Sequence, residues 1–197
     1  MKNLPNILSA FRMVLAPIFL FMYIQDELIW RSLSLAVFAT AAVTDYFDGK
    51  IARRYKLESD FGIFLDPLAD KFLTFAGFLC LPFLDPTQFP WWAVFAIVIR
   101  DVIVTLLRLY AGRKNITMKT RFTAKAKTLV QMVFLYLALL IGGFKQADIE
   151  FADVIAQLFN SGALYYAMMF VTALTVYSGI EYLWVNRDIF KPETPAT

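Results

Sequence analysis

The stretch TDYFDGKIARRYKLESDFGIFLDPLAD, residues 44–70, joins two strongly apolar segments of the chain. It holds six carboxylates and four basic residues. Four of its aspartates, Asp45, Asp48, Asp66 and Asp70, stand next to or within the apolar segments. A charged group is costly to bury in such surroundings and usually has a function there. Their position in apolar surroundings therefore indicates that these aspartates have a function.

The composition indicates a polytopic membrane protein. The chain has 197 residues, 59% of them hydrophobic and twenty of them Phe, and its mean hydropathy is +0.59. These values lie outside the range of soluble globular chains and suit one membrane domain over residues 1–197. A net charge of +3 does not indicate nucleic-acid binding. With Cys80 as the single cysteine and no histidine, disulfides and Cys/His metal sites are excluded.

Runs free of charged residues locate the candidate spans. Only the runs near 128–144 and 160–182 approach the roughly 20 residues that a spanning helix needs. The shorter runs become long enough if each helix continues through a few charged residues at one end. The sequence then predicts an all-α integral membrane fold with six transmembrane helices. We expect these helices near residues 4–24, 28–54, 66–84, 89–112, 120–142 and 161–184.

The basic residues predict the orientation of these helices. If the N-terminus is cytoplasmic, only Arg31 and Lys145 of the 19 Lys and Arg residues fall on the opposite side. Such a bias is typical of cytoplasmic loops, so we expect both termini in the cytoplasm. Residues 147–159 carry apolar side chains at helical spacing and predict a short interfacial helix.

Ionisable residues interrupt the spans only in their cytoplasmic portions. Embedded charges usually face a polar cavity, so their shared depth predicts one polar chamber open to the cytoplasm. The residues concerned are Arg12, Asp45, Asp48, Asp66, Asp70, Lys71, Arg100, Arg108, Lys125 and Lys127.

The four aspartates form two pairs at helical spacing. Asp45 and Asp48 are three residues apart, and Asp66 and Asp70 are four apart, so each pair shares one helix face. Carboxylate oxygens suit Mg²⁺ or Mn²⁺, hard cations that bridge carboxylates and substrate phosphates. Any one of them could have a structural role, Asp66 for example as a helix N-cap ahead of a proline. Four at matched spacings favour a metal site.

The same stretch resembles the CDP-alcohol phosphotransferase family. The family signature D-x2-D-G-x2-A-R-x8-G-x3-D-x3-D is filled by Asp45, Asp48, Gly49, Ala52, Arg53, Gly62, Asp66 and Asp70. The resemblance implies a six-helix membrane fold, commonly homodimeric, in a bacterial plasma membrane. It implies transfer of a phosphatidyl-type group from a CDP-linked lipid to an alcohol, with CMP released. The active site would face the cytoplasm.

The resemblance also implies roles for individual residues. Asp45, Asp48, Asp66 and Asp70 would bind two divalent ions, Mg²⁺ or Mn²⁺, and Asp70 would be the general base. The CDP-lipid would be bound by Asn6, Ile7, Leu8, Ser9, Gly49, Ala52, Arg53, Ser59 and Gly62.

Further segments, such as IRDVIVTLLR and KAKTLVQM, resemble the branch of the family that joins CDP-diacylglycerol to glycerol 3-phosphate. An acceptor with its own phosphate needs a cationic pocket, for which Arg100, Arg108, Lys125 and Lys127 are candidates. Lys125 and Lys127 point to opposite sides of a regular helix, so at most one of them should face the chamber. We expect Arg100 and Lys125 to bind the phosphate.

Three alternatives remain open at this stage. A cardiolipin synthase of the same family would use the same donor with phosphatidylglycerol as the acceptor. A divalent-cation transporter would also place carboxylates in a helical bundle, and a purely structural membrane scaffold is a third reading. The acids lie only at the cytoplasmic ends, and runs such as 72–84 are apolar, so no polar trail crosses the outer half. This pattern favours the enzyme.

Overall fold

The computed structural model describes residues 4–25, 27–55, 60–114, 118, 122–144 and 152–187. For residues 4–9, 45–55, 60–70, 113, 122 and 152 it describes the backbone and not the side chain. The described chain is helical and has no strand. Its elements are α1 (Leu4–Tyr23), α2 (Leu28–Tyr55), α3 (Asp60–Leu84), α4 (Trp91–Arg113), α5 (Phe122–Gly143), α6 (Ala152–Asn160) and α7 (Ala163–Val185).

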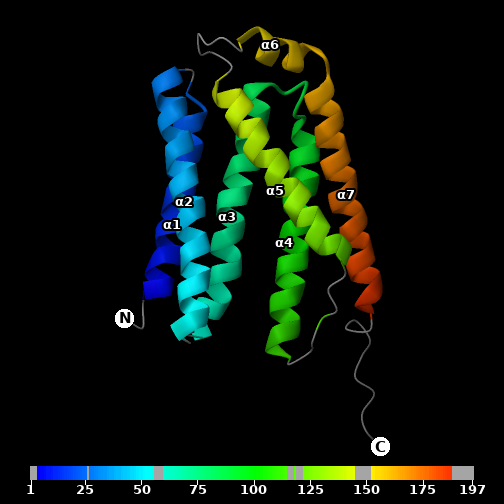
Figure 1. Ribbon diagram of the computed structural model, residues 1–197. Helices are drawn as coiled ribbons and strands as arrows, with labels where there is room; N and C mark the ends of the chain where they lie inside the picture. The colour runs from blue at the N-terminus through cyan, green and yellow to red at the C-terminus, as the bar shows by residue number, and fades with distance from the viewer. Residues whose placement is uncertain are drawn as a thin grey trace, which may run out of the picture.

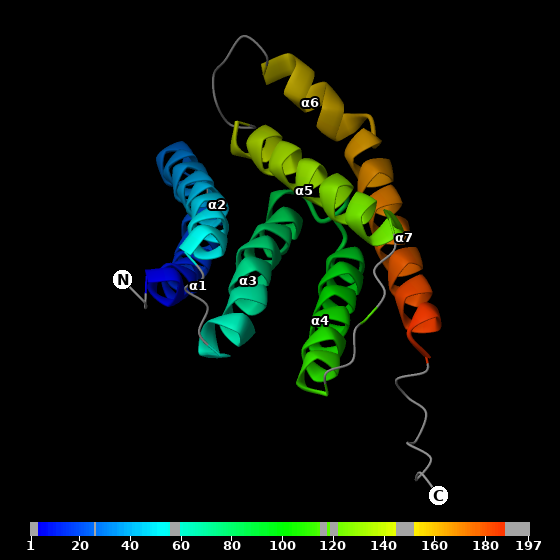
Figure 2. The ribbon, with the colours of Figure 1, turned by 60° about the horizontal axis from the view of Figure 1, so that its bottom comes forward.

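Six long helices form a bundle, and the short α6 lies across one end of it (Figure 1). α1 packs against α2 and α3, whereas α7 packs against α4 and α5. α3 also contacts α4 and α5 and so joins the two groups, which are seen side by side in Figure 2. The starts of α1, α3 and α5 and the ends of α2, α4 and α7 all lie at the end away from α6 (Figure 1). We call this the site end.

Close packing at small residues and one long-range hydrogen bond connect the first group to α5. The hydroxyl of Tyr23 in α1 donates to the carbonyl of Leu139 in α5 over 2.8 Å, inside the core. At Gly77 of α3 an added Cβ would lie 3.0 Å from Leu135 of α5, so the two helices meet closely there. Tyr23, Leu135 and Leu139 all belong to the buried apolar core of the bundle.

Turn chemistry explains where α4 and α7 begin. The side chain of Asp85 accepts hydrogen bonds from the backbone N–H of Thr87 and of Gln88, at 3.0 and 3.3 Å, and so closes the turn after α3. Pro90 precedes α4 with an extended backbone. Gly162 has a φ of +73°, a conformation that favours glycine, and lets the chain turn from α6 into α7.

Large apolar side chains remain exposed along every long helix, as in a protein surrounded by lipid. Examples are Phe21, Ile29, Phe83, Trp92, Leu129 and Tyr166. By length and composition, two of the described helices could cross a membrane, Thr123–Gly143 and Ala163–Val185. Three shorter stretches of the described residues are apolar as well, 10–23 in α1, 28–44 in α2 and 71–84 in α3.

The six long helices agree with the predicted ones to within about three residues at most ends. The exception is α3, which begins at Asp60, whereas the prediction began it at residue 66. The predicted start relied on the Asp66-Pro67 pair. An acidic residue at position 60 is equally favourable at a helix start, and the apolar pattern of residues 61–65 continues the helix from there. The short helix expected within 147–159 is present as α6; residues 145–151 lie outside the described part.

Candidate active site

The four signature aspartates lie on two neighbouring helices at the site end. Asp45 and Asp48 belong to the second half of α2, and Asp66 and Asp70 to the first half of α3. α2 and α3 contact each other. The described backbone therefore brings the two pairs to one end of the bundle. Their side chains are outside the described part, as are those expected to bind the CDP-lipid, including the whole of Ser59.

A polar cavity of about 80 Å³ opens beside them. It lies among α3, α4, α5 and α7. One of its lining residues is Lys71, which follows Asp70 in α3. Its lining residues are Lys71, Arg100, Asp101, Val104, Thr105, Arg108, Ala124, Lys127, Thr128 and Tyr182. We call this space the cation cavity, since it has four basic side chains and one carboxylate.

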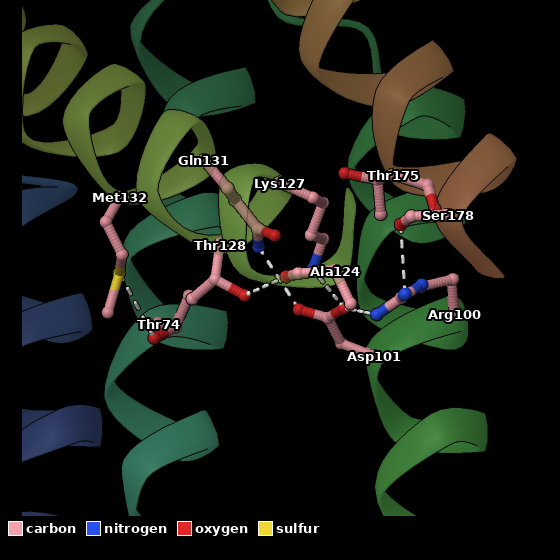
Figure 3. Close-up of polar contacts among 10 residues, drawn as sticks. All are labelled: Thr74, Arg100, Asp101, Ala124, Lys127, Thr128, Gln131, Met132, Thr175 and Ser178. Carbon is pink, nitrogen blue, oxygen red and sulfur yellow. Dashed lines mark hydrogen bonds and ion pairs between the residues drawn. The ribbon is translucent and has the colours of Figure 1, made fainter. Parts of the chain in front are cut away.

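Asp101 is the centre of a buried polar network on one wall of the cation cavity (Figure 3). Its Oδ1 accepts hydrogen bonds from Nζ of Lys127 at 2.5 Å and from Nη1 of Arg100 at 3.0 Å. Its Oδ2 accepts a third from Nε2 of Gln131 at 3.2 Å. The side chains of Asp101 and Lys127 are 1% and 2% exposed, and that of Arg100 is 13% exposed. Arg100 is thus the member that reaches furthest toward the open side.

α7 holds the other face of Arg100. Nη2 of Arg100 donates to Oγ of Ser178 at 3.0 Å, and Ser178 donates in turn to the carbonyl of Thr175 at 2.9 Å. A Cβ added at Gly179 would lie 2.8 Å from Cγ of Arg100. The absence of a side chain at Gly179 therefore provides the space in which the arginine stem lies.

Aromatic and polar contacts border the cavity toward the end of α7. The guanidinium of Arg108 lies over the ring of Tyr182, 5.9 Å from its centroid. The hydroxyl of Tyr182 donates to the sulfur of Met118 at 3.0 Å. Thr123 at the start of α5 donates to Glu181 of α7. These contacts connect α4, α5 and α7 where the cavity meets the surface.

Three of the four basic residues predicted to bind the acceptor phosphate meet in the cavity, namely Arg100, Arg108 and Lys127. Lys125 does not line it and is exposed on α5. Residues two apart on a helix point to nearly opposite sides, so only one of the two lysines reaches the cavity. The structure thus places Lys127, and not the preferred Lys125, on the cavity side, while the lysine that binds the phosphate stays a prediction.

Three residues that line the cavity, Lys71, Asp101 and Tyr182, were not predicted as parts of a phosphate site. Neither was Ser178, which does not line the cavity but accepts a hydrogen bond from Arg100. A signal for Asp101 was present, because Asp101, Thr105 and Arg108 follow the i, i+4, i+7 spacing of one helix face. Ser178 gave no such signal, since a serine in an apolar helix commonly bonds its own backbone. Its contact with Arg100 depends on how α7 packs against α4.

The charges of the cavity suit a small dianion. Among the residues whose side chains the structure describes, the lining has four basic groups and one carboxylate, a net positive charge. Charge-assisted hydrogen bonds from Arg and Lys are the strong ones for phosphate oxygens. The signature aspartates supply an oxygen-only ligand set on the adjoining helices. The arrangement can therefore hold a phosphate group next to a divalent-metal site.

Paired aspartates next to a cationic cavity in an apolar helical bundle define a phosphate-handling enzyme of the membrane. The chain belongs to the CDP-alcohol phosphatidyltransferase family, whose model matches residues 2–180. It is thus a transferase of a membrane-bound family, which sets aside the transporter and scaffold alternatives.

Relatives of the chain are similar to it over most of their length. A probable phosphatidylglycerophosphate synthase of Mycobacterium tuberculosis is 35% identical over 92% of this chain and 80% of its own. The CDP-diacylglycerol–glycerol-3-phosphate 3-phosphatidyltransferase of Rickettsia typhi is 32% identical over 90% of this chain and 95% of its own. The Escherichia coli enzyme of the same name is 31% identical, over 94% and 95%.

Proposed function

We propose that this protein transfers the phosphatidyl group of CDP-diacylglycerol to glycerol 3-phosphate, giving phosphatidylglycerophosphate and CMP. The names of its relatives support this reaction. The single observation that carries it is the cation cavity next to Asp70, with Lys71, Arg100, Arg108 and Lys127 around it. Of the two lipid-synthesis reactions considered, this one has an acceptor with a free phosphate dianion, and the cavity has the charge for it.

The signature aspartates fit a divalent-metal centre. Asp45, Asp48, Asp66 and Asp70 would hold two Mg²⁺ or Mn²⁺ ions, since they are four hard oxygen donors on adjoining helices at i, i+3 and i, i+4 spacing. When bound, these ions would neutralise charge on the diphosphate of the donor and stabilise the leaving CMP. The small residues Gly49 and Ala52 would let the donor approach α2 closely, with Arg53 and Ser59 on the CDP group and Gly62 and residues 6–9 completing its site.

The chain's own groups would carry out the remaining steps. Arg100, Lys127 and their neighbours bind the acceptor phosphate and so orient the 1-hydroxyl of glycerol 3-phosphate. Asp70 accepts the hydroxyl proton as the oxygen attacks the lipid-side phosphorus of the donor. The bond from that phosphorus to the CMP oxygen breaks, CMP leaves with the electron pair, and Asp70 returns its proton to solvent.

The same proposal includes the setting of the enzyme. We infer six membrane-spanning helices with both termini in the cytoplasm of a bacterial cell, a cytoplasmic active site and a homodimer. The bias of the basic residues supports the orientation. The up-and-down arrangement of the six long helices, with the start of α1 and the end of α7 at the site end, is consistent with it (Figure 1).

The test is release of CMP by the purified protein from CDP-diacylglycerol with Mg²⁺ or Mn²⁺, with and without glycerol 3-phosphate. We expect release that requires both acceptor and metal. Release that requires phosphatidylglycerol instead would assign the protein as a cardiolipin synthase. Folded protein that releases no CMP with either acceptor would overturn the proposal.

Lys127→Gln and Lys125→Gln are a matched pair for the acceptor site. Loss of a charged phosphate partner costs about 1.5–3 kcal/mol, so the KM for glycerol 3-phosphate should rise at least about tenfold in Lys127→Gln. Lys125→Gln, the same change on the exposed side of α5, should leave it within about twofold. Equal effects of the two changes would contradict the placement of the phosphate in the cation cavity.

A further inference from the structure

Asp101 has no role in the reaction proposed above, although it is the most deeply buried charged group of the cation cavity. A carboxylate that faces a phosphate site is at first sight unfavourable, because it repels the substrate. Both of its oxygens are used by donors from the protein: Lys127 and Arg100 on Oδ1 and Gln131 on Oδ2. Its position therefore calls for a reason other than substrate contact.

The chemistry of its neighbours provides one. An ionised carboxylate only accepts hydrogen bonds, and each of the three groups around it donates one. Lys127 is 2% exposed, and a buried ammonium without a counter-charge is strongly unfavourable. A flexible lysine and a long arginine also lose rotamer freedom when they bind a ligand, unless they are already fixed.

We propose that Asp101 is a positioning residue for the acceptor: it holds Lys127 and Arg100 in the orientation that binds the phosphate of the second substrate. This inference rests on the proposed function and assigns one more residue to it. Asp101 acts through the two cations and does not touch the substrate.

α7 also helps to fix the orientation of Arg100. Arg100 is held by Asp101 at Nη1 and by Ser178 at Nη2, at 3.0 Å in each case. A guanidinium whose two terminal nitrogens bond to Asp101 on α4 and to Ser178 on α7 has few alternative orientations. Lys127 on α5 completes the set, so the binding geometry depends on three helices that meet around one carboxylate (Figure 3).

Two other roles for Asp101 make opposite predictions. If it only offset positive charge, its removal would make the cavity more cationic and would lower the KM for glycerol 3-phosphate. If it only filled space, the isosteric Asp101→Asn would be tolerated and the larger Asp101→Glu would not. Positioning predicts the reverse order, because asparagine lacks the negative charge that holds the cations Lys127 and Arg100, whereas glutamate keeps an ionised, acceptor-only carboxylate.

The experiment compares wild type, Asp101→Asn, Asp101→Glu and Asp85→Asn by CMP release, with kcat and with KM for each substrate. In Asp101→Asn we expect the KM for glycerol 3-phosphate to rise about tenfold or more, with kcat and the KM for CDP-diacylglycerol within about threefold. Asp101→Glu should restore most of the affinity. Asp85→Asn is the control, because it is the same change outside the cavity lining, at the α3–α4 turn near the α6 end of the bundle (Figure 1), and it should leave the KM unchanged.

An unchanged or lowered KM for glycerol 3-phosphate in folded Asp101→Asn would overturn the inference. If Asp101→Asn does not fold, the double variant Asp101→Asn/Lys127→Gln removes the uncompensated ammonium. Its KM should exceed that of Lys127→Gln, because Arg100 has lost its bond as well, and equal values would overturn the inference. Wild-type protein whose release of CMP does not require glycerol 3-phosphate would refute the proposed function instead. The two failures are therefore distinguishable.

Discussion

Individual glycines in this bundle differ in how much space surrounds them for an added side chain. Gly179 is buried on α7 beside the stem of Arg100, whereas Gly112 on α4 is exposed and has no atom within 4 Å of an added Cβ. Both are helical, so they share the same backbone cost relative to alanine. The difference between them isolates the effect of steric contact with Arg100.

Gly179→Ala should impair acceptor binding. Its Cβ would lie 2.8 Å from Cγ and 3.1 Å from Nε of Arg100, so the guanidinium must shift away from Ser178. We expect the KM for glycerol 3-phosphate to rise about tenfold through the lost geometry of one charged partner. Gly112→Ala is the control and should stabilise the protein by roughly 0.5–1 kcal/mol with no change in this KM. Equal KM values for both variants would contradict the role given to Gly179.

Asp70→Asn tests the proposed base. The change keeps the size of the side chain and removes its proton-accepting charge. We expect kcat for CMP release to fall at least about a hundredfold, the range of a general base, with the variant still folded. Asp60→Asn, at the first residue of α3 and outside the signature, is the matched control. A kcat for Asp70→Asn within a few-fold of wild type would remove Asp70 from the chemistry.

At the scale of elements, one glutamine joins the ends of three helices. Nε2 of Gln88, in the turn between α3 and α4, donates to the carbonyl of Phe159 in α6 at 2.8 Å. Its Oε1 accepts a bond from the backbone N–H of Tyr165, in the first turn of α7, at 3.0 Å. This side chain therefore fixes the turn from α6 to α7 at the end opposite the site.

Gln88→Ala should lower stability without changing the acceptor site. Loss of two bonds, one of which satisfies an N–H at a helix start, should cost about 2 kcal/mol and lower the melting temperature in detergent by about 4–8 °C. The KM for glycerol 3-phosphate should stay as in wild type. Gln157→Ala, on the exposed side of α6, should leave the melting temperature within about 1 °C. A similar decrease in both variants would show that Gln88 has no special role.

At the scale of the whole molecule, the fold places the charged residues of the candidate site toward one end of the bundle, apart from the apolar lengths of its helices. Charged residues of α2, α3, α4 and α5 gather toward the site end, and the opposite end is closed by α6 and the turn before α4. This polarity is what a membrane enzyme requires when its donor is a lipid and its acceptor is dissolved in water. It also makes the orientation of the bundle measurable.

Cysteine labelling tests the orientation. Cys80 is fully buried, so Cys80→Ala gives a background without reactive thiols. In that background we expect Lys114→Cys, at the end of α4, to react with an impermeant maleimide only from the cytoplasmic side of oriented vesicles. Ser161→Cys, between α6 and α7, should react only from the other side. Labelling of both from one side would contradict the six-span arrangement with cytoplasmic ends.

The sequence by itself determined the helical elements and the family. Apolar runs and the bias of basic residues were sufficient to predict six long helices and the short α6. Fixed spacing within one stretch was sufficient to predict the family to which the chain belongs. These inferences succeed because helix periodicity and signature spacing are local, so residues a few positions apart contain the whole signal.

Only the tertiary structure decided which side chains share a cavity. It selected Lys127 over Lys125, and it joined Arg100 to Asp101 and to Ser178, 78 positions away. The start of α3 at Asp60 was also misjudged, because an acidic residue is an equally good helix start at either of two positions. The physical reason is the same for the cavity residues: the rotation of each helix about its axis is set by packing against its neighbours, and one sequence pattern is compatible with several rotations.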